Sequence, residues 1–83
     1  MATYFVYMLR SLKDGKFYTG HTANIRNRLA QHNKGRVHST KVRRPFELVY
    51  WESFRTRSEA MRRERQLKSR GRAEKEKLVG RFK

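Results

Sequence analysis

Eighty-three residues are enough for one small domain with one modest hydrophobic core, and we expect residues 1–83 to form a single domain. The chain has 22 Lys and Arg against 7 Asp and Glu, a formal net charge of +15. Because these charges repel one another, we expect the protein to bind an anionic partner. Nucleic acid fits best, because the basic residues are spread along the chain and no strongly hydrophobic amphipathic face favours a lipid surface. The chain contains no cysteine, which excludes disulfides and thiolate metal sites.

The composition and the beginning of the chain indicate a folded protein without an export signal. Aromatic residues make up 12% of the chain, which favours a folded domain over a disordered one. Met1-Ala2-Thr3-Tyr4 lacks the basic segment and apolar run of a signal peptide, and no apolar run approaches membrane-spanning length. We therefore expect a soluble protein of the cytoplasm.

The first part of the chain is typical of a β-hairpin. Residues 3–9 are rich in aromatic and β-branched side chains, and residues 16–19 are typical of the returning strand. Asp14-Gly15 between them is a strong turn signal. At Gly20 we expect a close backbone approach or an unusual dihedral angle.

A helix and a third strand are predicted next. The helix is capped by Thr22 or Asn24 and ends near residue 33. A polar, basic loop follows over residues 34–44. The mainly apolar segment 46–54 predicts a strand that packs in the core. For Trp51, packing is favoured over a role as a base-stacking platform.

Two helices are expected at the C-terminal end. Thr56 and Glu59 form a capping box that opens the first, and Gly71 is expected just past its end. A last short helix is predicted over residues 72–79, ended by Gly80. The order strand, strand, helix, strand, helix, helix predicts an α+β domain with a small three-stranded, mainly antiparallel sheet flanked by helices.

Glu64 is the most informative single residue of the chain. It lies four residues after Ala60, three after Met61 and three before Leu67, and so shares the apolar face of its helix. A carboxylate there is costly unless a cation or hydrogen bonds satisfy it. A metal ion beside a phosphate would do so, and so would a salt bridge to one of the many arginines. The helix alone does not decide between the two.

Four further residues could act together with this carboxylate. Arg28 and His32 are four apart on the first predicted helix and point the same way. Tyr7 and Tyr18 lie on either side of the hairpin turn, which would bring them close. A tyrosine hydroxyl titrates near a pH of about 10, and surrounding cations would lower its pKa and make it a usable general base.

Each of these four residues also has an ordinary structural explanation. The two tyrosines could be core aromatics of their strands. Arg28 could be a solvated surface arginine. His32 could be a hydrogen-bonded or exposed histidine near a helix end.

An ordered set of short motifs spans almost the whole chain. It consists of Phe5-Val6-Tyr7, Tyr18-Thr19-Gly20, Asn24-x-x-x-Arg28-Leu29-x-x-His32 and Glu59-Ala60-x-x-x-Glu64-x-x-Leu67-Lys68. With these spacings the set resembles the GIY-YIG nuclease family, and in particular its short standalone members. The first two motifs stand for the triplets after which that family is named.

The resemblance implies an enzyme that cuts a phosphodiester with one divalent metal ion, Mg²⁺ or Mn²⁺. By the same resemblance, Glu64 holds the metal ion and Arg28 contacts the scissile phosphate. Tyr7 and Tyr18 lie beside the phosphate and the attacking water, with Tyr7 the favoured proton acceptor and His32 near the same site. A single carboxylate is compatible with Mg²⁺, which keeps several waters and shares its shell with substrate phosphate.

The chain departs from the pattern of that family in two places. Phe5 and Val6 replace Gly and Ile in the first triplet, and Thr19 replaces Ile in the second, although Val and Thr also suit strands. Residues 69–83 contain no asparagine, whereas many members carry one after the metal-binding helix.

Further contacts to nucleic acid are expected from cationic side chains outside the catalytic set. We expect them at His21, Lys41, Arg43, Arg44, Arg63 and Lys68. His21 directly follows Gly20, in what we predict to be a loop, and could touch phosphate. The helix face that carries Arg63 could follow phosphates or only aid solubility.

We therefore predict a metal-dependent endonuclease that acts as a monomer on DNA rather than RNA. Little sequence preference is expected, because the chain has no room for a separate specificity domain. One alternative is a non-catalytic module with the same fold that binds DNA or structured RNA. Another is a small basic protein that helps assemble an RNA–protein particle. A carboxylate facing phosphate would repel the ligand of a pure binder, which favours the enzyme.

Overall fold

The computed structural model describes residues 2–82 and contains one three-stranded sheet. Its strands are β1 (Tyr4–Ser11), β2 (Phe17–Thr22) and β3 (Phe46–Phe54). β1 is the central strand, and both neighbours pair antiparallel with it in the order β2-β1-β3. The hairpin turn lies where the sequence predicted it, and Gly15 has a φ of 73°, which suits glycine.

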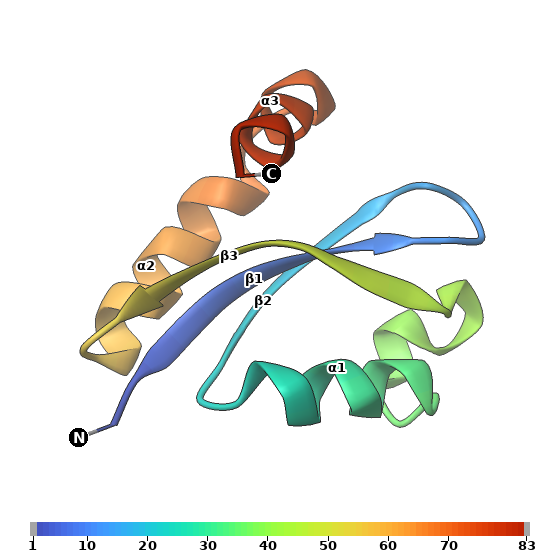
Figure 1. Cartoon of the computed structure of the whole chain (residues 1–83), viewed down its shortest axis with the longest axis horizontal. Coiled ribbons are helices and arrows are strands. Elements are labelled where there is room, and N and C mark those ends of the chain that lie inside the picture. The colour runs from blue at the N-terminus through green and yellow to red at the C-terminus, as the bar shows by residue number, and fades with distance from the viewer. Residues whose placement is uncertain (1, 83) are drawn as a thin grey trace.

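Helices lie on both sides of this sheet (Figure 1). α1 (Ile25–Asn33) covers one face, and α2 (Arg57–Lys68) and α3 (Arg72–Phe82) lie on the other. A 3₁₀ helix, η1 (His38–Arg43), stands where an irregular loop was expected. The predicted α+β class and the order of strands and α-helices are confirmed. No helix within residues 2–82 combines the length and the apolar character needed to cross a membrane.

Side-chain caps fix the beginnings of α1 and α2. Asn24 Oδ1 accepts a hydrogen bond from the Asn27 N–H at 3.0 Å, so Asn24 is the residue that caps α1. Thr56 Oγ1 accepts from the Glu59 N–H at 3.1 Å, as the capping box predicts.

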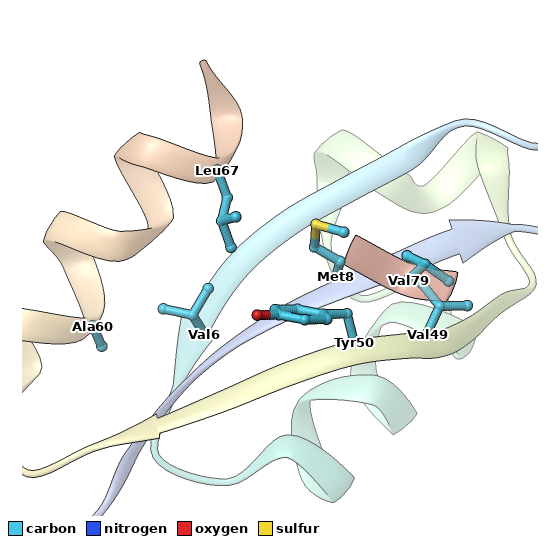
Figure 2. Close-up of a cluster of buried hydrophobic side chains, with 7 residues drawn as sticks. All are labelled: Val6, Met8, Val49, Tyr50, Ala60, Leu67 and Val79. Atoms are coloured by element: carbon cyan, nitrogen blue, oxygen red, sulfur yellow. The ribbon is translucent and has the colours of Figure 1, made fainter. Parts of the chain in front are cut away.

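Alternate residues of β1 enter two separate clusters of buried side chains. One cluster lies between the sheet and α2 and α3 (Figure 2) and consists of Val6, Met8, Val49, Tyr50, Ala60, Leu67 and Val79. The other contains Tyr7, Leu9 and Phe46, with residues of α1 packed against it. The division follows from the two-residue repeat of a strand, which sends neighbouring side chains to opposite faces.

Two glycine-based predictions at the C-terminal end are wrong. α3 continues through Gly80 to Phe82, whose ring packs on Tyr50 with centroids 5.2 Å apart. A glycine inside a helix costs only about 1 kcal/mol, so such packing can sustain the helix past it. Gly71 does not directly follow the cap of α2: the cap is Ser69, in a right-handed conformation, and Gly71 lies two residues further on without a positive φ.

Candidate active site

The two motif tyrosines lie side by side on the face of the sheet that α1 covers. Tyr7 pairs with Gly20, and Leu9 with Tyr18, so the tyrosines are diagonal neighbours with ring centroids 6.4 Å apart. A Cβ built on Gly20 would lie only 2.7 Å from the Tyr7 hydroxyl oxygen. Gly20 therefore leaves the space that this hydroxyl occupies, which confirms the close approach predicted there.

His32 is fully buried and links Tyr7 to Thr40. Its Nε2 lies 3.0 Å from the Tyr7 hydroxyl oxygen, and its Nδ1 lies 2.8 Å from Thr40 Oγ1. The Thr40 hydroxyl donates to the Val37 carbonyl oxygen at 3.4 Å and so accepts from the His32 Nδ1–H. Nε2 is then left to accept the hydrogen bond that the Tyr7 hydroxyl donates.

Burial sets the protonation states of this pair. Burial, with a smaller contribution from the positive charge of Arg28, lowers the pKa of His32 to about 4, so its imidazole is neutral at pH 7. Burial raises the pKa of Tyr7 to about 12, although Arg28 acts in the opposite direction. The expectation that cations would lower the Tyr7 pKa is therefore wrong, because desolvation outweighs the nearby guanidinium. In the resting protein Tyr7 keeps its proton.

Arg28 approaches these two side chains from α1, one turn before His32. It is half-buried, its Nη1 donates to Gln31 Oε1 at 2.9 Å, and its charge acts on the pKa values of both Tyr7 and His32. The four-residue spacing thus brings Arg28 and His32 together as predicted. A guanidinium that is half exposed beside a buried hydroxyl is well placed to meet a phosphate oxygen.

Glu64 lies on α2, against the opposite face of the sheet. Its side chain is 15% exposed and lies on the same side of the helix as the fully buried Ala60 and Leu67. Met61, by contrast, is 38% exposed. The apolar face of α2 is therefore narrower than the sequence indicated, and Glu64 lies at its edge.

Both carboxylate oxygens of Glu64 have partners within the protein. Oε1 lies 2.5 Å from His21 Nδ1, and Oε2 lies 2.6 Å from Lys68 Nζ. The partners are a histidine and a lysine, whereas an arginine was the expected alternative. His21 belongs to β2 and not to a loop, which corrects the predicted end of that strand.

Glu64 is ionised at neutral pH, and its charge acts on Tyr7. Burial alone would raise its pKa, but hydrogen bonds from Lys68 and His21 outweigh burial and lower it. The negative charge of Glu64 also contributes to the raised pKa of Tyr7. The charge of Glu64 on one face of the sheet therefore acts on the Tyr7 hydroxyl on the other.

The other predicted nucleic-acid contacts differ in their availability. Arg43 Nε lies 3.1 Å from Asp14 Oδ2, and Arg63 Nε lies 2.9 Å from Glu52 Oε2, so carboxylates already offset these charges. Lys41 and Arg44 are exposed and form no salt bridge within residues 2–82. The latter two are the better placed to meet phosphate.

Thr40 is a site residue that no sequence pattern indicated. It is fully buried and holds the imidazole of His32. In the sequence it is one polar residue among many in the basic segment 34–44, and no local pattern distinguishes it. Its role depends on the tertiary contact between η1 and α1.

Glu64 is the residue that fits a divalent cation. Within residues 2–82, no three His, Cys, Asp or Glu side chains come together as a metal-binding group. A single carboxylate still suits Mg²⁺, which keeps several waters and often shares its shell with phosphate oxygens. Because Lys68 and His21 each engage one oxygen of Glu64, at least one of these contacts has to open for an ion to bind.

Comparison with known proteins decides the family. A family model described as the GIY-YIG catalytic domain matches residues 3–77. The chain belongs to the GIY-YIG family. Over 80 residues it is 46% identical to the UPF0213 protein SH2523 from Staphylococcus haemolyticus, a match that covers 95% of this chain and 96% of that protein. It is 42% identical to the UPF0213 protein SSP2268 from Staphylococcus saprophyticus, with the same coverage.

A solved structure supports the same assignment. The solution NMR structure of the UPF0213 protein BH0048 from Bacillus halodurans has a TM-score of 0.59 and 39% sequence identity to this GIY-YIG chain. The match covers 94% of this chain and 83% of that one. These relatives are short standalone GIY-YIG proteins, as the sequence motifs predicted.

Proposed function

We propose that this GIY-YIG protein is a divalent-metal-dependent endonuclease that hydrolyses phosphodiester bonds in DNA with little sequence preference. One observation carries the proposal: a hydrogen-bonded Tyr7–His32 pair is buried beside Arg28, in the space that Gly20 leaves open. Buried polar pairs are costly to maintain, and an arginine beside this one provides a phosphate-binding group. The charge of +15 favours a nucleic acid as the substrate. We further propose that the protein acts as a monomer in the cytoplasm.

In the proposed reaction Arg28 binds the scissile phosphate. Its guanidinium would donate two hydrogen bonds to non-bridging oxygens and stabilise the charge that develops on them. Tyr18 packs against His32 with ring centroids 4.9 Å apart and helps to fix the imidazole. We assign its hydroxyl to the same phosphate.

Tyr7 and His32 would move the proton of the attacking water. As the water oxygen forms its bond to phosphorus, the Tyr7 oxygen takes the water proton and passes its own proton to His32 Nε2. The bond to the leaving oxygen breaks on the opposite side. While Arg28 is unpaired, its charge disfavours a proton on His32. A phosphate bound to Arg28 would offset that charge and so leave burial alone to oppose a proton on His32.

Glu64 would hold Mg²⁺ or Mn²⁺ through a carboxylate oxygen, together with water and phosphate oxygens. When bound, such an ion polarises the phosphoryl oxygen and stabilises the departing oxyanion. Lys68, whose side chain is 54% exposed, is free to leave Glu64 and pair with a phosphate instead.

A non-catalytic nucleic-acid-binding module is the second candidate, and one observation favours it. Both oxygens of Glu64 are already paired inside the protein, as in a structural ion pair. Such a module would use the same basic surface and leave its ligand intact.

A cleavage panel separates the two candidates. Single-stranded, duplex, flapped and branched DNA, and the same forms of RNA, are incubated with the wild-type chain in Mg²⁺, Mn²⁺ or EDTA. An Arg28→Ala preparation made in parallel controls for contaminating nucleases. We expect DNA to be cut with either metal and not in EDTA. Tight binding without cleavage on every substrate would overturn the nuclease and leave the binding module.

A further inference from the structure

An open apolar groove lies between α1 and the sheet, apart from the tyrosine–histidine pair. It has a volume of about 350 Å³ and is lined by Phe5, Ile25, Arg26, Leu29, Leu48 and Trp51. Five of these side chains are apolar or aromatic, the sixth is cationic, and none is acidic. We call this feature the α1 groove.

Trp51 forms an exposed aromatic wall of the α1 groove. It was expected in the core, yet 41% of it is exposed. The reason is that β3 is an edge strand, so no further strand covers this residue from the side. Phe5 and Phe82 contact it with ring centroids 6.0 and 5.8 Å away, at interplanar angles of 76° and 73°. Neither neighbour stacks flat against the indole. The ring is therefore oriented by its neighbours and still offers surface to a ligand.

We propose that the α1 groove is a stacking subsite for an unpaired nucleobase of the bound nucleic acid. The inference rests on the proposed nucleic-acid substrate and specifies its class as single-stranded or locally unpaired. Aromatic side chains with a cation beside them are the usual platform for unpaired bases, because every base has a π-face and every nucleotide a phosphate. Trp51 and Phe5 supply the platform, and Arg26 supplies the cation.

The position of the α1 groove connects it to the candidate active site. Ile25 and Leu29 line the groove and also pack against the cluster that contains Tyr7. Arg26 and Arg28 are two residues apart and so project from opposite sides of α1, which is about 10–12 Å wide with its side chains. A single strand that crosses α1 could place one phosphate at Arg28 and a nearby base in the groove.

A second copy of the chain is a poorer occupant of this groove. Each copy carries a charge of +15, and one of its cations, Arg26, lies in the groove itself, so two copies repel each other. A polyanion carrying aromatic bases matches both the charge and the apolar walls.

Trp51 is the single tryptophan of the chain, so its fluorescence reports on the groove directly. The wild-type chain is titrated in EDTA with an oligothymidylate, with an abasic strand of the same length, and with a fully paired duplex. The abasic strand keeps the phosphates and lacks the bases. We expect saturable quenching by the oligothymidylate, and little by the abasic strand or the duplex. Equal quenching by the abasic strand, or none by the oligothymidylate, would overturn the subsite.

Affinity measurements by fluorescence anisotropy of labelled strands provide the second arm. Trp51→Ala should weaken binding to the oligothymidylate by roughly 5- to 150-fold, the range found for stacked bases, and leave duplex binding unchanged. Trp51→Phe should keep most of the affinity, which separates the loss of stacking from misfolding. Met61→Ala, a change at a similarly exposed apolar residue on α2, should alter neither affinity. Equal losses on single strand and duplex in Trp51→Ala would contradict the proposal.

These outcomes can be told apart from failure of the proposed nuclease. Quenching and affinity are measured in EDTA and require no cleavage, so an inactive protein can still show the subsite. An active nuclease with no base-dependent quenching would lose only the subsite. Self-association that sedimentation equilibrium detects and Trp51→Ala abolishes would identify a second copy as the occupant, and would also overturn it.

Discussion

The central strand β1 contributes apolar side chains to one face of the sheet and a hydrogen-bonded tyrosine to the other. On the α2 and α3 face, Val6 and Met8 of β1 meet other apolar side chains (Figure 2). On the α1 face, Tyr7 lies between them in sequence but directs its hydroxyl to a buried histidine. One face has few polar groups to satisfy, whereas the other depends on a chain of hydrogen bonds through His32 and Thr40. The buried Tyr7–His32 pair therefore belongs to the α1 face alone, whereas Glu64 lies at the edge of the aliphatic cluster on the α2 face.

Met8→Ala tests whether the aliphatic cluster between the sheet and α2 and α3 serves stability alone. Met8 is fully buried, so its truncation should lower the free energy of unfolding by about 2–5 kcal/mol. Urea denaturation would measure this loss. Cleavage per folded molecule should stay near the wild-type value, because no proposed site residue belongs to that cluster. Loss of cleavage in the fully folded variant would show that this aliphatic cluster also supports the chemistry.

Arg28→Ala tests the chemistry of the α1 face. Many other cations can hold the nucleic acid, but Arg28 is the one beside the Tyr7–His32 pair. Cleavage should fall by about 10²–10³-fold, or roughly 2.7–4 kcal/mol in activation free energy, with a much smaller change in affinity. Arg62→Ala, at an exposed position of α2, is the matched control and should change the rate little. Equal losses of affinity and rate would make Arg28 an ordinary backbone contact.

The pH dependence of stability tests the buried state of His32. Its pKa is about 4 in the folded protein, against about 6.5 for an unfolded histidine. Between these values the unfolded chain binds the proton and the folded chain does not, so stability falls as pH falls. The loss should be on the order of 2–3 kcal/mol, full stability being present above a pH of about 6.5.

His32→Gln supplies the control for this measurement. Urea denaturation at several pH values should show a shallower slope in the variant between pH values of about 6.5 and 4.5, because carboxylates contribute equally to wild type and variant. Identical slopes for wild type and variant would mean that His32 is not held neutral by the fold.

Gly20→Ala tests the space around the Tyr7 hydroxyl. The added methyl would lie 2.7 Å from the hydroxyl oxygen, so Tyr7 has to shift and its bond to His32 is disturbed. Stability should fall by about 1–3 kcal/mol, as in other overpacked sites, and cleavage should fall further than stability explains. Gly71→Ala is the control, because nothing lies within 4 Å of its Cβ position. Wild-type cleavage in Gly20→Ala would remove Tyr7 from the reaction.

The sequence predicted correctly those turns, caps and helix faces that are determined by residues close together in the chain. The turn at Asp14-Gly15, the capping box of Thr56 and the i, i+4 pair of Arg28 and His32 all depend on a few adjacent residues. For these parts the spacing of residues is sufficient, because helix and strand periods fix which side chains share a face.

The parts that were mispredicted depend on tertiary contacts. The direction of the Tyr7 pKa shift follows from how deeply the ring is buried, which the strand pattern does not reveal. Thr40 acquires its partner from the neighbouring helix α1, and His21 acquires Glu64 from the distant helix α2. Packing of Phe82 against the sheet carries α3 past Gly80, where the local signal indicated an end.

Glu64→Gln tests most directly whether Glu64 acts in the proposed chemistry or only pairs with His21 and Lys68. Glutamine has nearly the same size, so the packing of α2 should survive while the charge is removed. We predict that cleavage with Mg²⁺ disappears and that the free energy of unfolding falls by no more than about 1 kcal/mol, because the pairs with His21 and Lys68 are partly exposed. DNA binding in EDTA should stay the same or tighten, since a negative charge near phosphate is gone. A variant that loses about 3–5 kcal/mol of stability, as expected for a broken buried ion pair, yet still cuts DNA per folded molecule would contradict the account.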